Sequence, residues 1–305
     1  MPLNTARLEM LSLLDNLGTV RAVAAALHLS PSAVSAQLAV LETEAHAELL
    51  RRTGRRVRLT DAGHALARHA RIILDQIDTA QDELRGLTGR PTGRVRVAAF
   101  SSAVRRLVIP LGTRLRTTHP SIDLVVTELD PQAAQPALRR GDHDLVVTAD
   151  FLDGALPVDP GIRTVPLLTD EIVLVTRPGL LATGAPADLA ALAGSAWSMD
   201  LPGTYLAHLV TTACRRAGFE PAVSGRFPSY ELLLAHVEAG LSVSLLPGLA
   251  VDDRYDVATH PLSPPLTRRV HAAVRGHSPL STATRIVLDE LRILADDDTA
   301  GTRGP

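Results

Sequence analysis

The chain has 305 residues, enough for about two domains of ordinary size, and its 46% hydrophobic content is sufficient to fill large cores. Its 31 Lys and Arg residues are all arginine, and the formal net charge of −2 excludes a chain coated by nucleic acid along its whole length. The single cysteine, Cys214, cannot form an intramolecular disulfide, the N-terminus lacks a signal-peptide pattern, and no apolar run approaches the ~18 residues of a membrane span. We therefore expect a cytoplasmic protein with no membrane segment.

The first thirty residues predict two helices joined by a tight turn. Leucines recur at helical spacing over residues 5–17, and a second apolar stripe runs through residues 19–27. Ala24 is small where two steeply crossing helices leave little room. His28 and Leu29 then turn the chain, and Leu29 is expected to fill the corner of a helix-turn-helix.

Residues 30–41 predict the helix that enters DNA. Ser30 can cap the helix through its hydroxyl, and Pro31 fits the first helical position, where its missing N–H is not needed. Val34, Leu38 and Leu41 form one narrow apolar stripe, while the opposite face carries short or polar side chains. A helix that lies against base edges needs such a face, because bulky side chains would hold it off the groove floor. We therefore predict DNA contacts by Ser30, Ser32, Ser35 and Gln37.

A basic hairpin is predicted next, with strands at 49–52 and 55–59 around a turn at Gly54. Val57 and Leu59 alternate with arginines, so one face is apolar and the other basic. Seven arginines and one acid lie between residues 49 and 72, a charge excess suited to phosphates. The alternative is a solvated charge run. As a wing, the hairpin would contact the DNA backbone or minor groove through Arg52, Arg55 and Arg56.

These segments resemble a known family. Residues 3–60 resemble the winged helix-turn-helix of LysR-type transcriptional regulators in Val23-Ala24-Ala25, Leu27-His28-Leu29-Ser30, Ala33-Val34-Ser35, Gln37-Leu38, Leu41-Glu42 and Arg52-Thr53-Gly54-Arg55. Pro31 stands where the family often has Gln, and Ala36 where it often has Arg, which removes two possible DNA contacts. The resemblance implies a regulator that binds a double-stranded DNA operator.

A long amphipathic helix is predicted from Asp61. Its apolar positions follow steps of three and four residues through 62, 66, 69, 73, 77, 80, 84 and 87, counting His69. Packing on its own domain would leave most of this length unsupported, so the stripe needs a partner helix. In the family this segment is the linker helix through which two subunits dimerise, which implies a homodimer or homotetramer. The Gly- and Pro-rich stretch 86–93 is the expected hinge.

From Arg94 on, strands and helices alternate, which predicts two α/β lobes built on a mostly parallel sheet. Strands are predicted at 95–99, 122–127, 144–148, 171–176, 241–246 and 271–275. Helices are predicted at 102–117, 132–140, 187–193, 206–217, 230–239 and 282–294. Crossovers between the lobes would leave a cleft at the carboxyl ends of the strands. This part resembles the family's effector-binding domain, itself shaped like periplasmic solute-binding proteins, in Pro110-Leu111 with Leu115, His119-Pro120, Glu238-Ala239-Gly240-Leu241 and Leu246-Pro247.

The predicted fold class is therefore α/β with an N-terminal all-α winged helix-turn-helix. The winged domain covers residues 1–60, the linker helix and hinge cover 61–92, and the two-lobed effector domain covers 93–295. The acidic, then Gly-rich tail at 296–305 is expected to be disordered.

Ser101 and Ser102 follow the first strand of the effector domain and open its helix. A helix N-terminus offers free N–H groups and partial positive charge, so these serines would bind a small-molecule effector that is a carboxylate; alternatively they only cap the helix. By position alone, further cleft contacts are predicted for Thr148, Asp150, Ser198, Gly203, Thr204, Phe227 and Ser229.

No catalytic or metal-binding pattern competes with this interpretation. Residues 240–244 approach a nucleophile elbow but lack its closing glycine and begin a strand. Asp142-His143-Asp144 fits a turn and a strand start better than a metal cluster, and the eleven histidines show no ligand spacing. We expect no cofactor and no enzymatic activity. The sequence favours a DNA-binding regulator over a solute-binding or enzymatic α/β protein with an incidental helical N-terminal domain.

Overall fold

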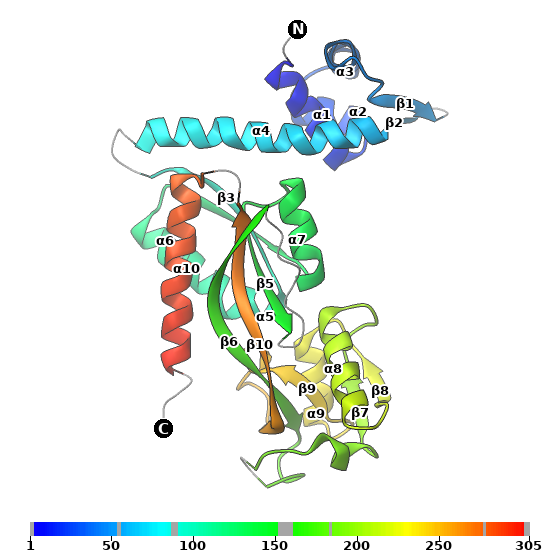
Figure 1. The fold of residues 1–305 in the computed structure, drawn as a ribbon, viewed down its shortest axis with the longest axis vertical. Coiled ribbons are helices and arrows are strands. Elements are labelled where there is room, and N and C mark those ends of the chain that lie inside the picture. Colours follow the sequence, from blue (N-terminus) through cyan, green and yellow to red (C-terminus); the bar gives the residue numbers. More distant parts are fainter. Residues whose placement is uncertain are drawn as a thin grey trace.

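The computed structural model describes residues 3–53, 56–86, 91–151, 161–182, 185–276 and 279–301. Three parts follow one another along the chain: a small N-terminal domain, the long helix α4 (Asp61–Gly86) and a two-lobed domain. Helix α4 lies across one end of the two-lobed domain, and the N-terminal domain packs against its first half (Figure 1).

The N-terminal domain contains α1 (Thr5–Leu17), α2 (Val20–Ala26) and α3 (Pro31–Ala45), followed by the hairpin of β1 (Leu50–Thr53) and β2 (Arg56–Leu59). The apolar stripe predicted for α3 is confirmed, since Val34, Leu38 and Leu41 are at most 1% exposed and pack in one core with α1 and α2. Leu29 was expected to fill the corner of the turn, and this is wrong. Its side chain is 42% exposed, while Leu27 packs against the core instead.

Helix α4 begins in close contact with the hairpin. The Thr60 hydroxyl accepts a hydrogen bond from the Gly63 N–H at 3.0 Å, which caps the first turn. A Cβ at Gly63 would lie 2.2 Å from the Leu49 carbonyl oxygen, so only glycine fits there. Ala67 and Ala70 are fully buried against the N-terminal domain.

The two-lobed domain is built on one six-stranded sheet in the order β4-β3-β5-β10-β6-β9. Its strands are β3 (Gly93–Ala99), β4 (Ile122–Glu128), β5 (Leu145–Phe151), β6 (Ile162–Thr176), β9 (Ser244–Pro247) and β10 (Ala258–Arg275). The prediction of a mostly parallel sheet is wrong. Strand β3 is parallel to β4 and β5, but β10 is antiparallel to β5 and β6, and β9 is antiparallel to β6, because the chain returns along two long strands.

The first lobe carries helices on both faces of the sheet. Val95 and Val97 face the core shared with α6 (Ile109–Thr118) and α10 (Thr282–Gly301), whereas Ala98 and Val146 face α7 (Pro131–Arg140). The predicted helix at 102–117 is present as α5 (Ser101–Ala103), the π-helical turn η1 (Val104–Val108) and α6 in direct succession.

The second lobe consists of the parallel pair β7 (Ala196–Met199) and β8 (Ala222–Arg226), the helices α8 (Tyr205–Arg216) and α9 (Tyr230–Glu238), and the short turns η2 (Leu189–Leu192) and η3 (Gly248–Ala250). Strands β6 and β10 run through both lobes and are paired from Ile162 opposite Arg275 to Thr176 opposite Ala258. The register shifts at two places in β10, between Pro261 and Leu266 and between Val270 and His271.

Three predicted elements differ in extent. The helix predicted at 187–193 is the single 3-10 turn η2, and the strand predicted at 171–176 is only the last part of the fifteen-residue β6. Helix α10 continues through Gly301, so the tail predicted to be disordered begins with helical residues; 302–305 lie outside the described residues.

Within the described ranges, no single helix combines the length and the apolar composition of a membrane span. Only α2 and α3 taken together pass such a test, and they are bent by 106° at the turn between them.

Candidate DNA interface and effector cleft

The start of α3 is built as the sequence predicts. The Ser30 hydroxyl accepts a hydrogen bond from the Ala33 N–H at 3.1 Å and lies 3.0 Å from the Ser32 hydroxyl, and Pro31 occupies the first turn. Ser30, Ser32 and Ser35 are exposed, on the side of α3 opposite its buried stripe. The first turns of α3 therefore present three hydroxyl groups to a partner, and the exposed Val40 lies farther along the helix.

Gln37 lies differently from the three serines. It is half-buried, and its Oε1 accepts a hydrogen bond from Arg7 Nε at 2.8 Å. Arg7 Nη1 also donates to Glu44 Oε1 at 2.5 Å, which joins α1 to α3. The carbonyl group of Gln37 thus has a partner within the domain, and its amide NH₂ is the part left to contact a base.

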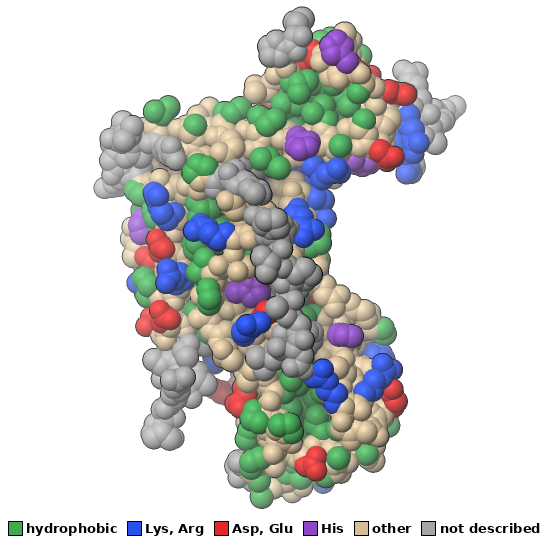
Figure 2. Space-filling model, viewed as in Figure 1, with side chains coloured by type: hydrophobic (Ala, Val, Ile, Leu, Met, Phe, Trp, Pro, Cys, Tyr) green, Lys and Arg blue, Asp and Glu red, His purple; other side chains and the backbone are tan. Residues whose placement is uncertain are grey.

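The hairpin presents a basic face beside α3. Arg51 and Arg58 are paired across the two strands and are both exposed, and Figure 2 shows basic side chains gathered at this end of the N-terminal domain. The Glu42 carboxylate accepts from the Leu49 and Leu50 N–H groups at 2.9 Å each and holds the hairpin against α3. Of the predicted wing contacts, Arg55 lies outside the described residues, and only the backbones of Arg52 and Arg56 are described.

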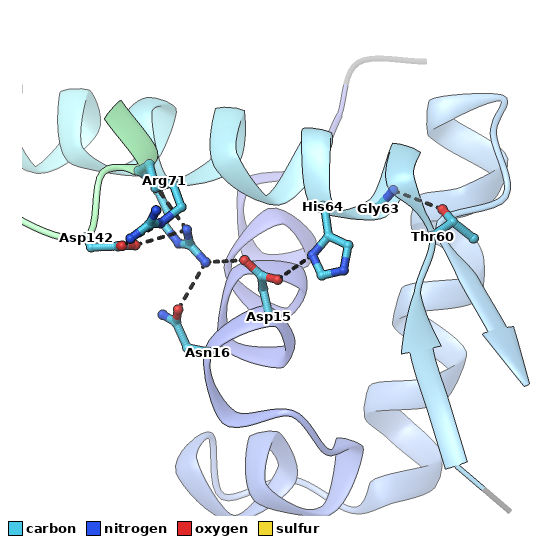
Figure 3. A network of polar contacts seen from close by, with 8 residues as sticks. Asp15, Asn16, Thr60, Gly63, His64, Arg71 and Asp142 are labelled. Atoms are coloured by element: carbon cyan, nitrogen blue, oxygen red, sulfur yellow. Dashed lines mark hydrogen bonds and ion pairs between the residues drawn. The ribbon is translucent and has the colours of Figure 1, made fainter. Parts of the chain in front are cut away.

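A buried arginine connects the N-terminal domain, α4 and the first lobe (Figure 3). The Arg71 guanidinium, 6% exposed, pairs with Asp15 and donates to Asn16 Oδ1 at 3.0 Å, both at the end of α1. It also donates to Asp142 Oδ1 at 3.2 Å, in the turn between α7 and β5. His64, about two turns earlier on α4, contacts the same Asp15 carboxylate at 2.7 Å. These contacts fix α4 to both of its neighbours.

A cavity of about 170 Å³ lies between the two lobes. Phe100, Ser101, Glu128, Leu129, Asp130 and Pro131 line it from the first lobe, and Asp200, Thr204, Tyr205, Leu206, Phe227, Pro228, Ser229, Tyr230 and Leu233 line it from the second. Arg268 of the central strand β10 also reaches it. A neighbouring cavity of about 270 Å³ is lined by five of the same residues, so the two are parts of one cleft: Ser101, Glu128, Pro228, Ser229 and Tyr230.

The predicted effector residues divide into two groups. Ser101, Thr204, Phe227 and Ser229 line the first cavity, and Ser101, Ser102 and Ser229 line the second. The remaining four are not among the lining residues of either cavity: Thr148, Asp150, Ser198 and Gly203. Thr148 and Ser198 are fully buried within their strands, and the Thr148 hydroxyl donates to the Pro131 carbonyl at 3.1 Å. Asp150 pairs with Arg269 at 2.8 Å, and Gly203 forms the turn before α8 with a φ of +89°.

Arg268 is a cleft residue that the sequence analysis did not identify. Its side chain is 1% exposed and donates to Asp170 Oδ2 at 2.7 and 2.9 Å and to the Ser102 hydroxyl at 3.0 Å. Its guanidinium carbon lies 4.5 Å from the centre of the Phe100 ring. The strand that carries Arg268 was expected to begin only at His271, so no sequence signal placed this residue in the cleft.

Three carboxylates also line the cavity without having been predicted. Asp130 caps α7 by accepting from the Gln132 N–H at 2.9 Å, and it reaches across the cleft to accept from the Tyr205 N–H at 3.1 Å. Burial raises the pKa of the Asp200 carboxyl above its ordinary value, and the nearby charge of Asp130 adds to this effect. Glu128 is exposed at the mouth of the cleft.

The described residues contain no group of three or more His, Cys, Asp or Glu side chains that could hold a metal ion. In the Asp142-His143-Asp144 motif, Asp142 pairs with Arg71 and Arg140, and Asp144 pairs with Arg96 at 2.7 Å. Both carboxylates therefore form ion pairs with arginines. Cys214 is fully buried, which raises the pKa of its thiol to about 12 and suits a packing role.

These features define a class of protein in which a winged helix-turn-helix domain is joined by a long helix to a two-lobed domain with a cleft between its lobes. Residues 5–64 match the model of the bacterial regulatory helix-turn-helix protein, lysR family, and residues 88–295 match that of the LysR substrate binding domain. The chain belongs to the LysR family of DNA-binding transcriptional regulators.

Curated relatives agree over most of the chain. A probable HTH-type transcriptional regulator LrrA of Synechococcus elongatus is 29% identical over 97% of this chain and 98% of its own. The nitrogen assimilation regulatory protein nac of Klebsiella aerogenes is 30% identical over 80% of this chain and 78% of its own. These relatives are regulators, which supports the non-enzymatic interpretation over the alternative of a solute-binding or enzymatic protein.

Solved structures show the same fold. A full-length, singly substituted OxyR from Pseudomonas aeruginosa superposes with a TM-score of 0.77, at 22% identity and 96% coverage of both chains. Full-length CbnR in complex with its target DNA gives a TM-score of 0.62, at 22% identity, covering 95% of this chain and 99% of that one.

Proposed function

We propose that this regulator binds a pseudo-palindromic double-stranded DNA operator as a homo-oligomer, and that a small molecule in the interlobe cleft changes this binding. The observation that carries the proposal is the exposed face of α3, where Ser32 and Ser35 stand opposite a fully buried apolar stripe. Short hydroxyl side chains let a helix approach the major-groove floor and bond base edges. Because an operator is chromosomal DNA, the proposed site of action is the cytoplasm.

The wing supplies the second part of the proposed DNA interface. Arg51 and Arg58 form an exposed basic pair beside α3, and the proposed interface also includes the predicted wing residues Arg52, Arg55 and Arg56. Phosphate contacts by arginine fix the position of a protein on the duplex and contribute most of its salt-dependent affinity. The three hydroxyls of α3, together with the Gln37 NH₂, would then read bases.

Helix α4 supports a homodimer or homotetramer. Beyond the part that packs on the N-terminal domain, Ile73 and Leu84 are 39% and 66% exposed, and Ile77 and Ala80 complete a stripe at helical spacing. An apolar stripe of this length on one helix is buried when a second copy of the helix packs along it. Light scattering of the purified full-length protein would test this, and a monomer at micromolar concentration would contradict it.

The cleft is the proposed effector site, with Ser101, Thr204, Phe227 and Ser229 among its walls. The residues that line the cleft give little support to the carboxylate effector that the sequence suggests. The helix that begins at Ser101 has only three α-helical residues before the π-helical turn η1, and the guanidinium of Arg268 is already paired with Asp170.

A direct test is a titration of full-length protein against a duplex of its own upstream region and against a scrambled duplex of equal length. We expect a preference of at least about a thousandfold for the specific site, as is typical of specific DNA-binding proteins. Repeating both titrations at about 50 and about 200 mM salt separates the phosphate contribution, which falls with salt, from base recognition. Equal affinity for both duplexes in several upstream fragments would refute sequence-specific binding.

A further inference from the structure

The cleft concentrates the aromatic residues of the chain. The protein has one Trp, three Tyr and four Phe, and four of these eight residues line the single cavity of about 170 Å³: Phe100, Tyr205, Phe227 and Tyr230. In a chain that is only 3% aromatic, this placement is not a consequence of composition. The faces of aromatic rings carry partial negative charge and attract ammonium and guanidinium groups.

The charged groups of the same cavity are mostly acidic. Glu128, Asp130 and Asp200 line it, and none of these carboxylates forms an ion pair with a basic side chain among the residues that the structure describes. The single basic group of the lining, Arg268, is compensated by the buried Asp170 carboxylate at 2.7 Å. The lining of this cavity therefore carries an excess of negative charge.

The carboxylates also come from both lobes. Glu128 is the last residue of β4 and Asp130 follows it in the first lobe, while Asp200 follows β7 in the second. Partial burial raises the pKa of Asp200, and the charge of Asp130 raises it further, so the two lobes hold like charges in a partly buried cleft. A positive charge placed between them would relieve this repulsion and so favour arrangements in which the two lobes lie close together.

We propose that the effector of this regulator is a small organic cation, an amine or guanidinium compound with an apolar body, held by Glu128, Asp130 and Asp200 against the aromatic walls of the cleft. This inference rests on the proposed function, because it takes the interlobe cleft as the effector site. The volumes of about 170 and 270 Å³ restrict the ligand to a small molecule, at or below the size of a typical drug-binding pocket.

Three ring compounds of nearly equal shape test the charge requirement: benzylamine, benzyl alcohol and benzoate. A linear pair, putrescine and succinate, extends the comparison. Each is added to the full-length protein at the same millimolar concentrations, and the melting temperature is followed through the fluorescence of Trp197. A ligand that binds only the folded state raises the melting temperature. We expect a rise with at least one of the two amines and none with the alcohol or the acids.

Two cavity variants, Glu128→Gln and Asp200→Asn, then locate the site. Each removes one charge-assisted contact, so the dissociation constant of the amine should rise about tenfold or more, measured by calorimetry. Asp123→Asn is the matched control, because Asp123 is an exposed acid on β4 that pairs with Arg94 and does not line the cavity. Its affinity for the amine should equal that of the wild type.

Several results would overturn the inference: binding of the acids but not the amines, amine binding that is unchanged in both cavity variants, or no response to any of the five compounds. The operator titration described above is run on the same preparations. Retained operator binding with a response to the acids would leave the proposed function intact and refute only the cationic effector. Loss of sequence-specific DNA binding would refute the proposed function itself.

Discussion

Arg71 gives the sharpest test of how the parts of the molecule are joined. Replacing it with Ala leaves the Asp15 and Asp142 carboxylates without their shared partner. Removing one member of a fully buried ion pair costs about 3–5 kcal/mol. The Asp15 and Asp142 side chains retain 16% and 27% exposure, so water can reach both, and we expect a smaller loss of about 2–3 kcal/mol. This corresponds to a fall in melting temperature of about 4–10 °C.

The distribution of aromatic residues makes this loss measurable domain by domain. Residues 1–99 contain no Phe, Tyr or Trp, so the fluorescence of Trp197 reports only on the second lobe, where the side chain is fully buried. Far-ultraviolet circular dichroism reports on the helices of the N-terminal domain and α4 as well. In a urea titration of Arg71→Ala, we expect the dichroism transition to move to lower urea and to separate from the fluorescence transition.

The control is Arg68→Ala, because Arg68 is exposed on the same helix, one turn before Arg71. It should unfold like the wild type. Asp142→Ala provides the cross-domain test, since it removes a partner in the first lobe and should still lower the dichroism midpoint of the N-terminal part. If Arg71→Ala and Arg68→Ala unfold within about 0.5 kcal/mol of each other, the network does not contribute to stability and the reasoning is refuted.

Four further outcomes follow from the structure. Ser35→Ala should narrow the affinity gap between specific and scrambled duplexes by about 1–3 kcal/mol in titrations, whereas an equal loss on both would exclude base contact. Replacing Arg51 and Arg58 with Ala should reduce the slope of log K against log salt by about 0.9 per arginine, and an unchanged slope would mean that neither touches phosphate. Gly63→Ala should destabilise the N-terminal domain by about 3 kcal/mol in urea titrations followed by dichroism, because its Cβ overlaps a backbone carbonyl; full stability would contradict that packing. Burial lowers the pKa of His271 below 6.5, so the unfolded state binds more protons and stability should fall as pH drops below about 6.5, with a flatter profile in His271→Asn.

The sequence predicted best where local rules decide the structure. The cap at Ser30, the proline after it and the stripe of Val34, Leu38 and Leu41 depend on residues within one helix, and each is found as expected. The corner residue of the turn was predicted wrongly. Leu27 and Leu29 are both apolar and near the turn, and only the angle at which α2 meets α3 decides which of them is buried.

The cleft was harder to predict because its walls come from distant parts of the chain. Arg268 and Asp170 are separated by 98 positions, and neither stands in a local pattern that marks a site. Pro166 and Asp170 interrupt the apolar run of β6, so its first half did not resemble a strand. Thr148 and Ser198 were assigned to the cleft by their position in the sequence alone, but a residue inside a strand faces the core or the cleft according to its register.

The paired strands β6 and β10 determine how the two lobes can move relative to each other. Both strands cross from one lobe to the other, so the lobes share a ladder of backbone hydrogen bonds that is interrupted only at two register shifts. Sliding the lobes along the strands would break every rung and reverse which side chains face inward. Twisting and bending about the strand pair leave the rungs intact, and the register shifts near Pro261 and Val270 are where the ladder yields most easily. If the proposed effector binds between the lobes, a change in their relative position would therefore be a rotation about the axis of this strand pair and not a displacement along it.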